Sequence, residues 1–144
     1  MYSVKELFYT LQGEGVNAGR AAVFCRFAGC NLWNGREQDR IEAICRFCDT
    51  DFVGTDGPGG SRYETAEGLA RAARACWPHN GTTSLRPLLV CTGGEPLLQL
   101  DASAVVSFKT AGFEIAIETN GTVIPPSGLD WICVSPKADV DLIL

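Results

Sequence analysis

Four apolar segments of this chain, each short enough for a β-strand, lead into a polar motif. The segments are residues 21–27, 88–91, 113–119 and 131–134, and the motifs are Cys30, Gly93-Gly94-Glu95, Glu118-Thr119-Asn120 and Ser135-Pro136-Lys137. Helical patterns over residues 65–77 and 101–112 separate some of these strands, and residues 2–9 supply a further candidate strand. Alternating strands and helices predict an α/β fold with a parallel sheet, in which ligands bind beyond the carboxyl ends of the strands.

The composition is that of a globular protein that is acidic overall. Hydrophobic residues make up 46% of the 144 residues, enough for one domain with its own core. The formal net charge is −5, whereas proteins that bind nucleic acid or anionic membranes through many phosphates are usually basic, so we expect neither partner. Residues 1–6 carry charges where a signal peptide needs an apolar run, and no stretch is long and apolar enough to span a bilayer. We therefore expect a cytoplasmic protein.

Three of the seven cysteines are spaced like the ligands of a metal centre. Cys30, Cys45 and Cys48 form the pattern C-x14-C-x2-C, and the last two lie in a long polar segment, residues 31–61. Three thiolates on an iron–sulfur cluster would leave one iron open to a small molecule that carries an amine and a carboxylate. The alternative is a structural zinc site in which Cys25 is the fourth thiolate. The cysteine spacing by itself leaves both interpretations open.

Further motifs along the chain resemble those of one known family. They are Val4-Lys5-Glu6, Gln12-Gly13-Glu14-Gly15, Arg26-Phe27-Ala28-Gly29-Cys30-Asn31-Leu32, Cys45-Arg46-Phe47-Cys48-Asp49-Thr50, Thr92-Gly93-Gly94-Glu95-Pro96, Glu118-Thr119-Asn120-Gly121 and Ser135-Pro136-Lys137. In this order they resemble the 7-carboxy-7-deazaguanine synthases, a family of radical S-adenosylmethionine enzymes with this unusually wide spacing of the first two cysteines. The resemblance covers nearly the whole chain, and it favours the iron–sulfur cluster over zinc.

The resemblance implies that Cys30, Cys45 and Cys48 hold a [4Fe–4S] cluster whose fourth iron is chelated by S-adenosyl-L-methionine. It implies no catalytic residue beyond the cluster and this cofactor. The residues that match cofactor-binding positions are Phe47, Cys48, Asp49, Gly93, Gly94, Glu95, Glu118, Ser135, Pro136 and Lys137. Judged from the residues alone, packing remains open for Phe47, a structural or solvated role for Glu118, and a surface position for Lys137.

The resemblance also implies a substrate, 6-carboxy-5,6,7,8-tetrahydropterin, which becomes 7-carboxy-7-deazaguanine with loss of ammonia on the route to queuosine. The residues that match substrate-binding positions are Leu11, Gln12, Gly13, Glu14, Arg26 and Thr92. The guanidinium of Arg26 suits a carboxylate, although an ion pair within the protein is the alternative for Arg26 and Glu14. Thr50 matches the protein ligand of a Mg²⁺ ion at the substrate, and such ions keep few protein ligands. Judged from the residues alone, a threonine in an Asp-Thr-Asp turn is more often a cap, so this role rests on the resemblance.

A partial (β/α) barrel of the radical S-adenosylmethionine type, C-terminally truncated, is the fold that the resemblance implies for residues 1–144 as a single domain. A complete barrel of this kind takes about 250 residues. The implied partners are an electron donor such as a flavodoxin and a second copy of the full-length chain. Two rival functions are an activase that makes a glycyl radical on a partner protein and a zinc-stabilised binding module.

Other residues that often carry function are expected to lie outside the site. The cysteines and tryptophans expected to pack in the core are Cys76, Cys91, Cys133, Trp33, Trp77 and Trp131. His79 lies in a polar loop and is expected at the surface. The mixed-charge segment 36–40 is expected to be a solvated loop face.

Overall fold

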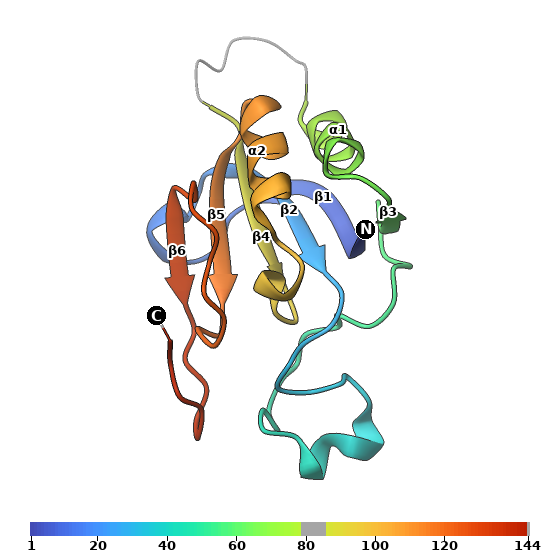
Figure 1. The fold of residues 1–144 in the computed structure, drawn as a ribbon, viewed down its shortest axis with the longest axis vertical. Helices are drawn as coiled ribbons and strands as arrows, with labels where there is room; N and C mark the ends of the chain where they lie inside the picture. Colours follow the sequence, from blue (N-terminus) through green and yellow to red (C-terminus); the bar gives the residue numbers. More distant parts are fainter. Residues whose placement is uncertain (79–85, 144) are drawn as a thin grey trace.

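The computed structural model describes residues 1–78 and 86–143, which form a mixed α/β structure around a six-stranded sheet (Figure 1). The strands are β1 (Tyr2–Leu11), β2 (Ala21–Phe27), β3 (Ser61–Tyr63), β4 (Leu88–Gly93), β5 (Glu114–Thr119) and β6 (Trp131–Val134). The α-helices are α1 (Ala66–Cys76) and α2 (Ala102–Thr110), and short 3-10 helices cover Gly15–Asn17, Glu37–Glu42 and Pro96–Leu98. The predicted surface position of His79 lies outside the described residues.

The sheet has the order β3-β1-β2-β4-β5-β6, and its strands do not all run in one direction. Strands β2, β4, β5 and β6 are parallel, so the prediction of a parallel sheet is confirmed for the four strands that carry polar motifs. It is wrong for β1, which pairs antiparallel with both β2 and β3. A short connection suffices between antiparallel neighbours such as β1 and β2, whereas parallel neighbours need a longer crossover. Within the described residues the sheet is open, with β3 and β6 at its edges.

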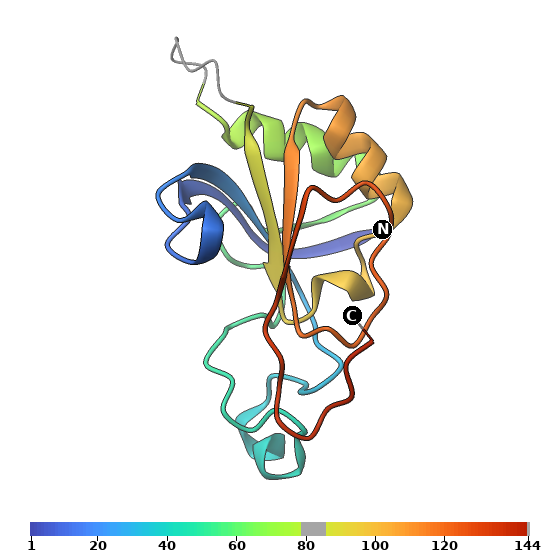
Figure 2. The same ribbon diagram turned by 90° about the vertical axis from the view of Figure 1, so that its left-hand side faces the viewer.

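Both α-helices cover the same face of the sheet (Figure 2). The hydroxyl of Thr65 accepts the Gly68 N–H at the start of α1, and the carboxylate of Asp101 accepts the Ala104 N–H at the start of α2. These side chains satisfy backbone donors that the first helical turn leaves free. The apolar faces of the two helices therefore meet the sheet at fixed positions.

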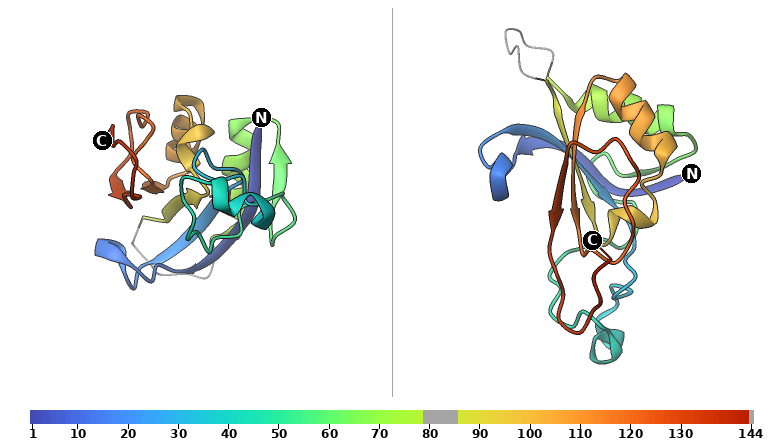
Figure 3. Two further views of the ribbon diagram at one scale, coloured as in Figure 1. Left: turned by 90° about the horizontal axis from the view of Figure 1, so that it is seen from below. Right: turned by 60° about the vertical axis from the view of Figure 1, so that its left-hand side comes forward.

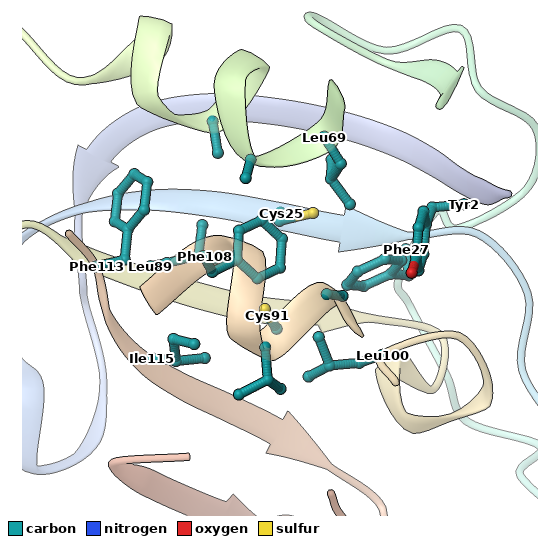
Figure 4. Packing of buried hydrophobic residues seen from close by; sticks show 14 of the residues in the cluster. Tyr2, Cys25, Phe27, Leu69, Leu89, Cys91, Leu100, Phe108, Phe113 and Ile115 are labelled. Carbon is teal, nitrogen blue, oxygen red and sulfur yellow. The ribbon is translucent and has the colours of Figure 1, made fainter. Parts of the chain in front are cut away.

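The main core lies between the helices and the sheet (Figure 4). Leu69 of α1 and Phe108 of α2 pack over a row of fully buried strand residues that includes Cys25 and Cys91. Burial raises the pKa of both thiols far above the ordinary value, because the thiolate loses its hydration there. Cys91 is confirmed as a core residue. Cys25 is enclosed in the same core, so it is not available as a fourth ligand beside the other cysteines.

The opposite face of the sheet is not covered by these helices and carries a smaller apolar cluster of Ala22, Leu88, Val90 and Ala116. Side chains alternate between the two faces of a strand, so residues two positions farther along point the same way. Strand register places Arg26 level with Thr92, and Glu118 level with Cys133. This face therefore becomes polar as it approaches the carboxyl edge, where the segment between β2 and β3 projects beyond the sheet (Figure 3).

Candidate active site

A cavity of about 450 Å³ lies at the carboxyl edge of the parallel strands. Three parts of the chain line it: the connection between β1 and β2, the cysteine-bearing loop, and the ends of β4, β5 and β6. The predicted site residues that line it are Gln12, Glu14, Cys45, Phe47, Cys48, Asp49, Thr50, Thr92, Gly93, Gly94, Glu118, Ser135 and Lys137. The predicted site residues that do not line it are Leu11, Gly13, Arg26, Cys30, Glu95 and Pro136.

The three candidate ligand cysteines lie on one loop, but they do not converge on a single point. Cys45 and Cys48 line the cavity, whereas Cys30 follows the end of β2 and its Sγ accepts the Leu32 N–H at 3.4 Å. Partial burial raises the pKa of the Cys30 thiol, and backbone N–H donors from Leu32 and Trp33 offset part of that rise. Among the described residues, no three His, Cys, Asp or Glu side chains are grouped closely enough to hold one metal ion.

Thiol donors suit both zinc and iron–sulfur clusters, but the two place different demands on geometry. A zinc ion needs all its ligands in contact with one atom, whereas a [4Fe–4S] cluster binds each thiolate through a different iron. The Leu32 N–H that points at the Cys30 sulfur is the kind of hydrogen bond that stabilises sulfur ligands of such a cluster. The four-thiolate zinc site fails because Cys25 lies in the core, which leaves three thiols, the number that a cluster with one open iron takes.

The Gly93-Gly94 turn lets the end of β4 pack directly on the residues that lead to Cys30. A Cβ on Gly93 would meet the Phe27 carbonyl oxygen at 2.3 Å. A Cβ on Gly94 would meet the Gly29 carbonyl oxygen at 2.2 Å and the Cys30 Cβ at 2.8 Å. All three contacts are closer than real atoms allow, so the glycines are needed for this approach of the two segments.

Glu95 is fully buried and its carboxylate is engaged within the protein. Oε1 accepts the Leu97 N–H at 3.0 Å and the Thr119 hydroxyl at 2.8 Å, and Oε2 accepts the Asn120 N–H at 2.8 Å. A buried carboxylate is tolerated when such donors replace its lost water. Glu95 therefore ties the turn after β4 to the end of β5 instead of lining the cavity.

A closed ring of hydrogen bonds, which sequence reasoning missed, joins the residue after Cys30 to the end of β5. The Asn120 amide donates to Asn31 Oδ1 at 3.0 Å, and the Asn31 amide donates to the Thr122 hydroxyl at 2.8 Å. The Thr122 hydroxyl completes the ring by donating to Asn120 Oδ1 at 2.6 Å. The sequence did contain a signal for this ring, because the short polar residues Asn31 and Asn120 follow two strands that end at the same edge of the sheet. The ring fixes the backbone next to Cys30 relative to β5.

On the other side of the cavity, Gln12 reaches across from the end of β1. Its amide donates to the Glu118 carboxylate at 2.8 Å, while its carbonyl oxygen accepts the Glu14 N–H at 3.2 Å. Arg20 holds the same connection with two hydrogen bonds to the carboxylate of Glu114, at 2.8 and 3.0 Å. These contacts place three of the predicted substrate and cofactor residues in one hydrogen-bonded group.

Arg26 forms an ion pair with Glu6 across the β1–β2 pair, with 2.7 Å between Nε and Oε1. The interstrand ion pair, the alternative left open by the sequence, is thus present. Both side chains are largely covered, and neither lines the cavity.

Two residues expected in the core instead line the cavity. Cys133 is exposed and Trp131 is about half exposed, and both belong to β6. Their strand lies at the edge of the sheet, and the face on which they sit is the one that the two helices leave open. The residues of β6 are therefore not buried, although its sequence is apolar. The core prediction is confirmed for Trp33, which is buried edge-on against Phe52.

The fold and the cavity define an α/β protein with a cavity beyond the carboxyl ends of its parallel strands, the place where such folds bind small ligands. The chain is 63% identical to 7-carboxy-7-deazaguanine synthase from Caulobacter vibrioides, over 99% of this chain and 66% of that protein. It is 59% identical to the synthase from Burkholderia multivorans, over 99% of this chain and 67% of that protein. The chain belongs to the 7-carboxy-7-deazaguanine synthase family.

Other comparisons agree with this assignment or add nothing to it. The crystal structure of QueE from Escherichia coli matches with a TM-score of 0.65 and 27% identity, over 94% of this chain and 60% of that one. No protein-family model matches the chain. No described helix is long and apolar enough to cross a membrane. The chain spans about two thirds of the length of the relatives it matches.

Proposed function

We propose that this chain binds the cluster and cofactor of a radical S-adenosylmethionine enzyme that converts 6-carboxy-5,6,7,8-tetrahydropterin to 7-carboxy-7-deazaguanine with loss of ammonia. The observation that carries the proposal is one cavity that joins Cys45, Cys48 and the Gly93-Gly94 turn, with Cys30 packed against that turn. The membership of the chain in the synthase family supports the choice of reaction. The fold that this proposal requires is part of a (β/α) barrel of the radical S-adenosylmethionine type.

In this proposal Cys30, Cys45 and Cys48 hold a [4Fe–4S] cluster, and S-adenosylmethionine binds beside it. When bound, the reduced cluster and this cofactor supply the one-electron chemistry that starts the reaction. The chain's own residues position the ligands and limit the access of water to the cavity. Phe47 offers an aromatic face to the adenine, and Ser135 and Lys137 offer polar groups from the end of β6.

The same proposal places the pterin between the β1–β2 connection and the open face of the sheet. Gln12 and Glu14 present an amide and a carboxylate, which can pair with the donors and acceptors on a pterin edge. Thr50 lines the cavity two residues after Cys48, and its hydroxyl would serve as the protein ligand of Mg²⁺, with substrate and water completing the shell. Arg26 would bind the substrate carboxylate only by exchanging its present partner, Glu6.

An electron donor such as a flavodoxin completes the proposed chemistry, because the cluster must be reduced before each reaction starts. We also propose a homodimer for the full-length protein. Chemical reduction replaces the protein donor in the test below, so the test of the site does not depend on the donor's identity.

The test is anaerobic reconstitution of the chain with iron and sulfide, followed by electron paramagnetic resonance with and without S-adenosylmethionine. We expect a brown protein with about four irons per chain, a reduced signal that changes when the cofactor is added, and loss of iron in Cys45→Ala. Cys76→Ala is the matched control, because Cys76 packs against the core away from the cavity. A colourless protein that holds one zinc per chain would instead support the binding module, and cofactor cleavage that requires a protein substrate would support the activase.

A further inference from the structure

One side chain of the mixed-charge segment 36–40 turns inward. The side chain of Arg40 is only 27% exposed. Its Nη1 donates to the carbonyl oxygens of Arg46 and Cys48, both at 2.9 Å. Its other nitrogens bind the carboxylate of Glu37 at 2.8–2.9 Å, and its central carbon lies 4.1 Å from the centre of the Trp33 ring. The expectation of a solvated face is therefore wrong for Arg40.

These contacts connect the two ends of the long cysteine spacing. Trp33 follows Cys30 by three residues, whereas the two carbonyl oxygens flank Phe47 inside the C-x2-C turn. Only a planar guanidinium can stack on an aromatic ring and donate in several directions within its plane. A lysine at this position has a single ammonium, which cannot reproduce the whole set. Arg40 therefore contacts both ends of the segment that separates the first cysteine from the other two.

The guanidinium of Arg40 lies against the turn that carries Cys45 and Cys48, because it binds two carbonyl oxygens of that turn. The pKa of Arg40 is raised chiefly by its hydrogen bonds to Glu37, so the guanidinium keeps its charge. Glu37 itself is largely exposed, so water screens its carboxylate. The guanidinium, by contrast, is held against the carbonyl of Cys48. A fixed positive charge near a redox centre favours the state that carries one more electron.

We propose that Arg40 is a positioning residue for the cluster: it fixes the C-x2-C turn through the carbonyls of Arg46 and Cys48 and raises the reduction potential with its nearby charge. The electrostatic half of this proposal rests on the proposed function, since it requires a bound cluster. The half that concerns the turn can be measured in the metal-free chain.

The test compares Arg40→Gln, Arg40→Lys and the matched control Arg36→Gln, which removes the same charge from an exposed position of the same loop. In the reconstituted chain we expect a more negative midpoint potential for Arg40→Gln, a smaller shift for Arg40→Lys, and the original value for Arg36→Gln. In the metal-free chain we expect amide hydrogens of the peptide spanning residues 45–50 to exchange about tenfold faster in Arg40→Gln.

Each outcome has one meaning. If Arg40→Gln and Arg36→Gln shift the potential equally, or neither shifts it, the electrostatic role is overturned. If exchange over residues 45–50 is unchanged in Arg40→Gln, the positioning role is overturned. If the unmodified chain takes up no iron, the proposed function and the electrostatic role both fail, and the exchange measurement decides the positioning role by itself. Circular dichroism of each variant separates these local effects from unfolding.

Discussion

The carboxylate of Glu95 accepts the backbone N–H of Asn120 at 2.8 Å, and this buried contact joins the ends of β4 and β5. The backbone N–H of Glu95 in turn donates to the Gly29 carbonyl oxygen at 2.9 Å, which brings in the end of β2. The side chain of Asn120 then reaches Asn31, the neighbour of Cys30. The position of Cys30 therefore depends on a carboxylate that does not itself line the cavity.

The first prediction concerns the loss of that carboxylate. Glu95→Gln replaces one acceptor oxygen with an NH₂ group in a place where three donors converge, so at least one donor pair is left facing each other. We expect the free energy of unfolding to fall by about 1–3 kcal/mol, the range for a buried donor left without an acceptor. Urea denaturation measures this change. Glu64→Gln is the control, because Glu64 is exposed, and an equal effect of both substitutions would contradict the prediction.

The second prediction concerns the approach of Gly94 to Cys30. In Gly94→Ala the new methyl group must displace Gly29 and Cys30, because it would lie 2.2 Å from the Gly29 carbonyl oxygen. We expect a loss of about 1–3 kcal/mol in the free energy of unfolding, together with reduced iron uptake on reconstitution. Gly13→Ala is the steric control, since no atom lies within 4 Å of a Cβ placed there. Full iron uptake by Gly94→Ala would show that Cys30 does not depend on this contact.

The third prediction concerns the dependence of stability on pH. The Lys5 ammonium binds Asp56 at 2.8 Å and Asp51 at 2.9 Å, and these contacts lower the pKa of both carboxyl groups. A carboxyl group with a lowered pKa stabilises the folded state above its ordinary pKa of about 4, and this contribution is lost as the pH falls through the lowered value. We therefore expect Lys5→Met to be less stable than the unchanged chain at pH 7, and the difference to shrink below about pH 4.

Urea denaturation of both proteins between about pH 3 and pH 7 measures this trend. A difference that stays constant over this range would mean that Lys5 acts through a contact that does not depend on these carboxylates, such as its hydrogen bond to the Val53 carbonyl oxygen at 2.9 Å. The result matters for the site because Asp51 follows Thr50, so the same ion pairs attach the end of the cysteine-bearing loop to β1.

The sequence predicted the strand ends that form the site, for a physical reason. A short apolar run that is followed at once by glycine or by short polar residues is typical of a strand that ends at the edge of a sheet. Residues 21–27 and 131–134 were predicted with the bounds that β2 and β6 have. The short strand β3 was missed, because its three residues, Ser61–Tyr63, carry no apolar alternation and are held mainly by pairing with β1.

What the sequence could not supply was which face of a strand is covered. Cys91 and Cys133 both follow apolar residues in strands, yet Cys91 lies beneath α2 and Cys133 lines the cavity. That difference depends on where the helices pack, which is a tertiary property. Arg40 shows the same limit, because a run of charged residues does not reveal which one finds buried carbonyls.

The last prediction concerns Phe47, whose side chain is 68% exposed although it lines the cavity. An aromatic ring that is this exposed contributes little to folding. Phe47→Ala should therefore leave the free energy of unfolding within about 0.5 kcal/mol of its original value. If the ring stacks on the adenine of S-adenosylmethionine, the substitution should weaken binding of that cofactor about tenfold, as expected for one lost base–aromatic stack. Isothermal titration of the reconstituted chain measures the affinity.

Ile41→Ala is the matched control for this prediction. Ile41 is 77% exposed on the same loop, but it does not line the cavity, so its loss should leave the affinity for the cofactor unchanged. Equal affinities for Phe47→Ala and the unchanged chain would remove Phe47 from the cofactor site and leave it as an exposed apolar residue of the loop. Equal losses in both variants would point instead to a general loosening of the cysteine-bearing loop, because two side chains that share only their exposure would then act alike.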